Sequence, residues 1–193
     1  MRLHAARAYL DVAAMLDEFP EVRLTVNFVP SLLQQLEAVA AGARDSWTEL
    51  ALRPTSSWSP DDKLFLLERF FSVQWQHGVE ARPRYLELLE KRGRFFPPAE
   101  GPIGFGRPLS RRIVQSFSDA ELRDLTVLFH LAWLGFAVRR GEPTVAELEA
   151  RGRDFEAQDL LHLVELEQRA VRRVLPLYRA LAERGQIELS ATP

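Results

Sequence analysis

One short stretch, residues 22–36, constrains the fold of this chain more than any other. Apolar and polar residues alternate over 22–28, which is the pattern of a half-buried β-strand. From Pro30 onward the apolar spacing becomes helical, and proline suits a first helical turn because it has no amide hydrogen to leave unsatisfied. A strand that leads directly into a helix is the building step of α/β barrels and open sheets. In such folds the strand ends carry the chemistry, so Asn27 and the turn after it are the first candidate for function.

Helical patterns dominate the rest of the chain. Apolar spacing and capping signals predict helices over about 3–19, 45–52, 60–76, 83–91, 118–140, from 144, and 155–184. A proline- and glycine-rich stretch, 94–109, is expected to be a long loop. A short alternating run at the end predicts a second strand. We therefore expect a mostly α-helical chain with two strands, at about 22–29 and 186–190.

Composition excludes several classes of protein. With 193 residues, 47% of them hydrophobic, the chain fits a single domain. A net charge of −2 gives no field that favours nucleic acid or an anionic membrane, and no apolar run approaches the length of a membrane span. The absence of cysteine rules out disulfides, thiolate zinc sites and cysteine nucleophiles. Because the N-terminus lacks the pattern of a secretory signal, we expect a cytoplasmic protein.

Few side chains lie in a sequence pattern that indicates a catalytic or binding role. None of the four histidines has a partner at metal-ligand spacing, so the histidines predict no metal site. Trp133 lies on an apolar helical stripe and is either core or, near a barrel mouth, a surface for stacking a sugar. Glu188 lies in the second predicted strand between apolar neighbours, so its side chain faces either solvent or a barrel interior. A carboxylate at the mouth of a parallel strand is a plausible ligand for sugar hydroxyls, which suit charged acceptors.

Four stretches carry a resemblance to a known family. They read RLHAARAYLDVAAMLDEFP, VRLTVNFVPSLLQQL, DLTVLFHLAWLG and RALAERGQIELSATP. The last contains Gly185, Glu188 and Leu189 in a Gly-x-x-Glu-Leu pattern. In their order and spacing, these stretches resemble the N-terminal portion of glycoside hydrolase family 57, which includes α-amylases, amylopullulanases, branching enzymes and 4-α-glucanotransferases.

The resemblance implies a (β/α)7 barrel and a retaining mechanism. In that mechanism two carboxylates about 5–5.5 Å apart act as nucleophile and as acid/base. The family's first strand, with a His-Gln-Pro type motif, is expected ahead of Arg2, and its glutamate nucleophile and aspartate acid/base are expected beyond Pro193. Residues 1–193 are thus expected to be a single incomplete domain, a partial barrel with a large helical insertion and no catalytic residue.

The same resemblance supplies the candidate binding residues. Glu188 carries over by position as a substrate-binding residue, and Asn27, His4 and Trp133 are expected near the pocket. The expected partner is an α-glucan oligosaccharide or polysaccharide, with no nucleic acid and no membrane. The resemblance implies no metal and no organic cofactor.

Two functional hypotheses fit these observations, and a third lacks the residues that it requires. The first is the N-terminal fragment of a retaining glycoside hydrolase acting on α-glucans, inactive alone, with exposed strand edges that promote self-association. The alternative is a stand-alone, non-catalytic helical module for binding or scaffolding, derived from that barrel. A polysaccharide deacetylase would require a cluster of Asp and His metal ligands, and the sequence contains none.

Overall fold

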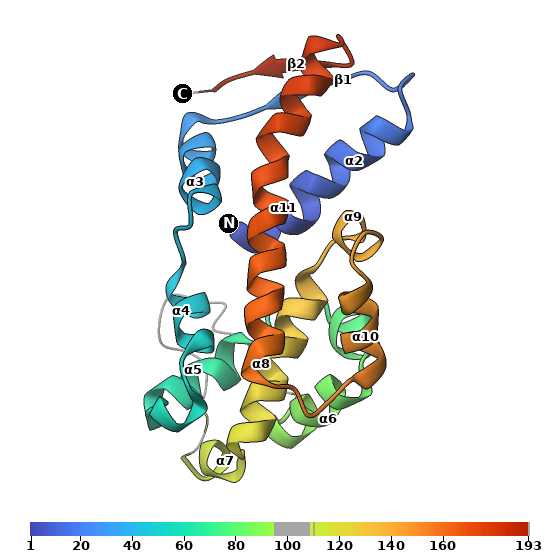
Figure 1. Ribbon diagram of the computed structural model, residues 1–193. Helices are drawn as coiled ribbons and strands as arrows, with labels where there is room; N and C mark the ends of the chain where they lie inside the picture. Colours follow the sequence, from blue (N-terminus) through green and yellow to red (C-terminus); the bar gives the residue numbers. More distant parts are fainter. Residues whose placement is uncertain (95–108, 110, 193) are drawn as a thin grey trace. The chain divides into compact units, whose positions relative to one another are not determined.

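The structure is a computed structural model, and it describes residues 1–94, 109 and 111–192 (Figure 1). The predicted loop over 94–109 lies, apart from its two end residues, outside the described residues. The described chain is mostly helical, as the sequence predicts, and it divides into two compact units. Unit 1 comprises Met1–Asp45, Trp133–Ala146 and Val164–Pro193, and unit 2 comprises Ser46–Ala132 and Glu147–Leu163.

Unit 1 contains the two strands and the ends of the chain. Its elements are α1 (Arg2–His4), the π-helical turn η1 (Ala5–Tyr9), α2 (Leu10–Glu18), β1 (Leu24–Asn27), α3 (Pro30–Ala40), α9 (Phe136–Arg139) and β2 (Ile187–Ser190). The long helix α11 (Ala157–Glu183) contributes its first seven residues to unit 2 and the rest to unit 1.

Unit 2 is helical throughout its described residues. Its elements are α4 (Ser46–Leu52), the 3₁₀ turn η2 (Thr55–Ser57), α5 (Pro60–Arg69), the π-helical turn η3 (Trp75–Val79), α6 (Pro83–Arg92), α7 (Arg111–Ser116), α8 (Asp119–Trp133) and α10 (Pro143–Arg151), of which the last two also extend into unit 1. Its core contains the rings of Trp47, Phe70 and Phe129, with 4.6 Å between the centroids of the two phenylalanines.

β1 and β2 pair in parallel and lie side by side in Figure 1. The register places Leu24 opposite Ile187 and Asn27 opposite Ser190, and the Phe28 amide extends the pairing by donating to the Ser190 carbonyl at 2.9 Å. Both strands are shorter than the predicted ranges 22–29 and 186–190. Two parallel strands are compatible with part of an α/β sheet, and the described residues contain no further strand of a barrel.

The strand-to-helix step follows the prediction closely. Pro30 is the first residue of α3, with Val29 in an extended conformation before it. At the other end of the unit, α11 ends at Glu183. Gly185 then adopts a φ of +70°, and the Gln186 amide donates to the Leu181 carbonyl. This left-handed residue reverses the chain from α11 into β2.

Two predicted helices are shorter than expected. The helix predicted over 60–76 ends at Arg69, and a separate turn, η3, begins after Gln74, whose side chain accepts from the His77 amide. The helix predicted over 118–140 is interrupted at Gly135, and α9 begins after it. In both cases a side-chain oxygen caps a backbone amide, an interaction that apolar periodicity does not reveal.

Candidate functional site

The sheet of unit 1 has one polar and one apolar face. Side chains alternate along a strand, and paired residues in this register share a face. One face therefore carries Thr25, Asn27, Glu188 and Ser190, all of them exposed. We call these four residues the polar face.

Helix α11 packs against part of the opposite face. Phe28 continues the apolar side of β1, and its ring meets Tyr178 of α11 edge to face, with 4.9 Å between centroids. Ile187 on the same side is 5% exposed. Burial raises the pKa of the Tyr178 hydroxyl, which therefore stays protonated and donates to the Tyr9 carbonyl at 3.1 Å. The polar face is thus the side of the sheet turned away from α11.

Two side-chain hydrogen bonds organise the polar face. The Thr25 hydroxyl donates to Glu188 Oε2 at 3.4 Å, and Asn27 Nδ2 donates to Thr192 Oγ1 at 2.5 Å. Asn27 and Ser190 are the last residues of their strands, so the amide and the serine hydroxyl lie at the carboxyl end of the sheet. The structure therefore places Glu188 and Asn27, predicted from separate signals, on one surface.

A buried amide fixes where β2 begins. Gln186 is 1% exposed, and its Nε2 donates to the carbonyls of Leu16 and Phe19 at 2.5 and 3.0 Å. Its Oε1 accepts from Arg184 Nε at 2.7 Å. Because Gln186 satisfies carbonyls at the end of α2, the strand that carries Glu188 is held against that helix.

The other two predicted residues form a pair of their own. The rings of His4 and Trp133 lie 5.0 Å apart at 78°, with His4 exposed and Trp133 half-buried. Trp133 is thus neither fully core nor a free stacking surface. The turn that carries His4 is anchored by Arg2, a buried side chain that forms ion pairs with the buried Glu167 and with Asp45.

Thr25, Ser190 and Thr192 are not among the site residues predicted from the sequence. The alternation of polar and apolar residues in both strands is visible in the sequence, but the register that pairs the strands is not. Only this register places Thr25 and Ser190 beside Asn27 and Glu188. The register depends on how the two strands meet across more than 150 residues of chain, which local patterns do not reveal.

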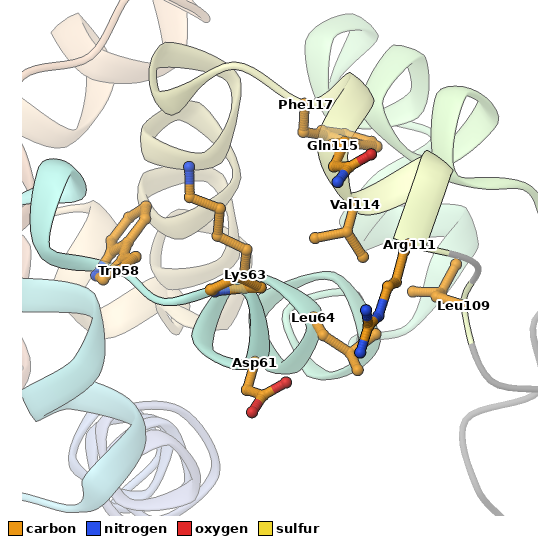
Figure 2. A pocket seen from close by; sticks show the side chains of 10 residues that line it. Trp58, Asp61, Lys63, Leu64, Leu109, Arg111, Val114, Gln115 and Phe117 are labelled. Atoms are coloured by element: carbon orange, nitrogen blue, oxygen red, sulfur yellow. The ribbon is translucent and has the colours of Figure 1, made fainter.

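A cavity lies elsewhere, in unit 2. Its volume is about 640 Å³, and Figure 2 shows it lined mainly by side chains of α5 and α7. Its floor is apolar, with Leu64 and Val114, and Asp61 and Arg111 lie at its rim. Lys63 points away from Asp61 in this view and pairs with Asp119 at 2.7 Å. None of the four predicted site residues lines this cavity.

Neither a cluster of metal ligands nor a helix suited to crossing a membrane occurs within residues 1–94, 109 and 111–192. Within these ranges no three His, Asp or Glu side chains are grouped so that they could hold a metal ion. No helix of the described chain has the length and apolar content to cross a membrane.

Comparison with known proteins identifies the family. The sequence model described as glycosyl hydrolase family 57 matches residues 1–193, the whole of the chain. No curated protein and no solved structure matches it. The match confirms the resemblance carried by the four stretches, including the segment with Gly185 and Glu188. The chain belongs to glycosyl hydrolase family 57.

Proposed function

We propose that these 193 residues form the N-terminal part of a retaining glycoside hydrolase that acts on α-glucans, and that they bind substrate without supplying the catalytic carboxylates. Family membership assigns the chain to glycoside hydrolases, whose substrates are carbohydrates. The order of the matched stretches along the family supports the N-terminal position. In this proposal β1 and β2 are two neighbouring strands of the family's barrel.

The observation that carries the proposal is the exposed Glu188 carboxylate on the polar face. A carboxylate accepts hydrogen bonds from hydroxyl groups, and charge-assisted bonds of this kind are stronger than neutral ones. In a barrel whose helices lie outside, the side of the sheet away from α11 would face the interior, where substrate binds. Asn27 at the end of β1 adds an amide to the same surface.

His4 and Trp133 supply a second contact in this proposal. The half-buried indole offers apolar surface to a sugar ring, and the exposed imidazole beside it offers a polar edge. Such a combination suits the apolar faces and equatorial hydroxyls of a glucose unit.

Calorimetric titration of the purified chain with maltoheptaose tests the binding role. Loss of a charged acceptor costs about 1.5–3 kcal/mol, so Glu188→Gln should weaken binding roughly 10- to 100-fold. Glu165→Gln is the matched control, because Glu165 is also exposed in unit 1 but lies on α11. Equal affinity of the Glu188→Gln variant and the wild type would contradict the proposal.

The same preparation tests the catalytic claim. We expect no release of reducing sugar from maltooligosaccharides by the 193-residue chain, because the nucleophile and acid/base of the family are not among the matched motifs it carries. Hydrolysis that disappears in Glu188→Gln would instead make Glu188 a catalytic residue.

A further inference from the structure

Two threonines, Thr25 on the polar face and Thr192 just after β2, each form a hydrogen bond with one of the predicted ligand residues. Resting on the proposed function, we propose that Thr25 and Thr192 are positioning residues, which set Glu188 and Asn27 to present two outward hydrogen-bond acceptors to the hydroxyl groups of a neutral sugar. Neither threonine belongs to the binding residues predicted from the sequence.

Thr25 sets the orientation of the Glu188 carboxylate. Its hydroxyl has a single hydrogen, which it donates to Oε2 at 3.4 Å from the directly opposite position in the register. No hydrogen bond from a described residue reaches Oε1. One carboxylate oxygen is thus held by the sheet while the other remains available to a ligand.

Thr192 sets the orientation of the Asn27 amide. An amide can present either its donor or its acceptor end, and here Nδ2 is directed to Thr192 Oγ1 at 2.5 Å. Oδ1 is therefore the end turned away from Thr192. Within the described chain, no other residue hydrogen-bonds to this side chain.

The register determines how far apart the two acceptors lie. Glu188 is opposite Thr25 and Asn27 is opposite Ser190, so the two acceptors are diagonal neighbours across the strand pair. Diagonal neighbours in a sheet have Cβ atoms roughly 7–8 Å apart, a span that hydroxyl groups of one sugar ring or of two linked rings can bridge.

The chemistry of the surface selects the class of ligand. Two acceptors, one of them a carboxylate, match hydroxyl donors and repel anions such as sugar phosphates. The polar face carries no cationic side chain that would offset this repulsion. The ligand class is therefore an uncharged polyhydroxyl compound, in keeping with a glucan.

Isosteric substitutions remove each hydroxyl with little change in shape. In Thr25→Val and Thr192→Val we expect the Glu188 and Asn27 side chains to lose their single orientation. NMR would show this as averaged side-chain couplings for Glu188 and a shifted Nδ2 resonance pair for Asn27. Thr25→Ser and Thr192→Ser should restore the wild-type spectra. Thr55→Val in the η2 turn is the matched control, and it should leave these resonances unchanged.

The affinity for maltoheptaose provides a second readout. Each valine variant should bind about 3- to 10-fold more weakly, as expected for the loss of one intramolecular hydrogen bond of typical net strength. In a Glu188→Ala background, which leaves no acceptor for the Thr25 hydroxyl, Thr25→Val should add nothing, because its effect acts through Glu188.

The outcomes separate this inference from the proposed function. Unchanged Glu188 and Asn27 spectra in the valine variants would overturn the positioning role, and so would altered spectra with unchanged affinity. If the wild type binds maltoheptaose but Glu188→Gln binds equally well, the proposed function fails. A wild type that binds maltitol 6-phosphate as well as it binds maltitol would overturn the selection for uncharged ligands.

Discussion

Gly135 lies where no larger residue fits without displacing a helix cap. A Cβ atom at this position would lie 2.4 Å from Asp11 Oδ1, and the two Asp11 oxygens accept from the amides of Phe136 and Ala137 at 3.1 and 3.0 Å. The Asp11 carboxylate can therefore not move aside without losing hydrogen bonds to the start of α9. The interruption between α8 and α9 follows from this contact between residues 124 positions apart in the sequence.

We expect Gly135→Ala to reduce the free energy of unfolding by about 1–3 kcal/mol, the cost of leaving hydrogen-bonding groups unsatisfied. Urea denaturation measures this change. In an Asp11→Ala background the same substitution should cost much less, because the clash is gone. Gly141→Ala serves as the control, since the nearest atom to an added Cβ there is 3.9 Å away. If Gly135→Ala lowers the free energy of unfolding just as much in the Asp11→Ala background, the clash with Asp11 is not the cause.

At the scale of the element, the clearest local signal is the start of α5. Ser59 Oγ accepts from the Asp62 amide at 3.1 Å, and Asp62 Oδ2 accepts from the Ser59 amide at 3.0 Å. Burial alone would raise the pKa of Asp62, but the hydrogen bonds from Ser59 and Arg53 outweigh it and hold this pKa below its usual value. The capping carboxylate therefore stays ionised to lower pH in the folded protein than in the unfolded chain.

Removal of this cap should lower the free energy of unfolding by an amount that depends on pH. Ser59→Ala should lower the free energy of unfolding by about 1 kcal/mol. The penalty for Asp62→Asn should be fully present above the unfolded pKa of about 3.9 and should disappear as pH falls through the lower folded pKa. Urea denaturation at pH 7, 5 and 3 measures both. Asp61→Asn, which removes a charge in the same helical turn but leaves the cap intact, is the matched control. A penalty for Asp62→Asn that does not decrease between pH 5 and pH 3 would contradict this account.

Elements were predictable where their signals are local. Pro30 and residues 59–62 predict helix starts from local sequence alone, and the structure confirms both starts. The end of α8 depends on Asp11, and the polar face depends on pairing between β1 and β2; both are contacts between distant parts of the chain. Glu188 and Asn27 could be predicted as candidates, but the threonines that orient them could not.

At the scale of the whole molecule, the two-stranded sheet has uncommon exposure. Parallel sheets are normally covered on both faces, and strand edges with unpaired amides invite pairing with other chains. Here Leu189 is 50% exposed and Leu24 is 37% exposed on the apolar side, while the whole polar face is exposed. Among the described residues, no third strand borders either edge.

We predict that the 193-residue chain associates with itself as its concentration rises, which light scattering can follow. Leu189→Lys should reduce this association, because a charge on an exposed strand opposes edge pairing. Val12→Lys is the control, since Val12 is 42% exposed but lies on α2. A chain that stays monomeric and unfolds cooperatively would instead favour the helical binding or scaffolding module.

In the π-helical turn over Ala5–Tyr9, the number of residues determines the direction in which the preceding side chains point. A π turn holds one residue more than an α-helical turn, so an in-frame loss of one codon here would leave a continuous α-helix. Each α-helical residue advances about 100° around the axis, and every side chain before the deletion would turn by that amount. His4 would then point away from Trp133, and Arg2 would leave Glu167. A single codon thus sets the phase of the N-terminal turn, and with it which of its side chains face Trp133 and Glu167.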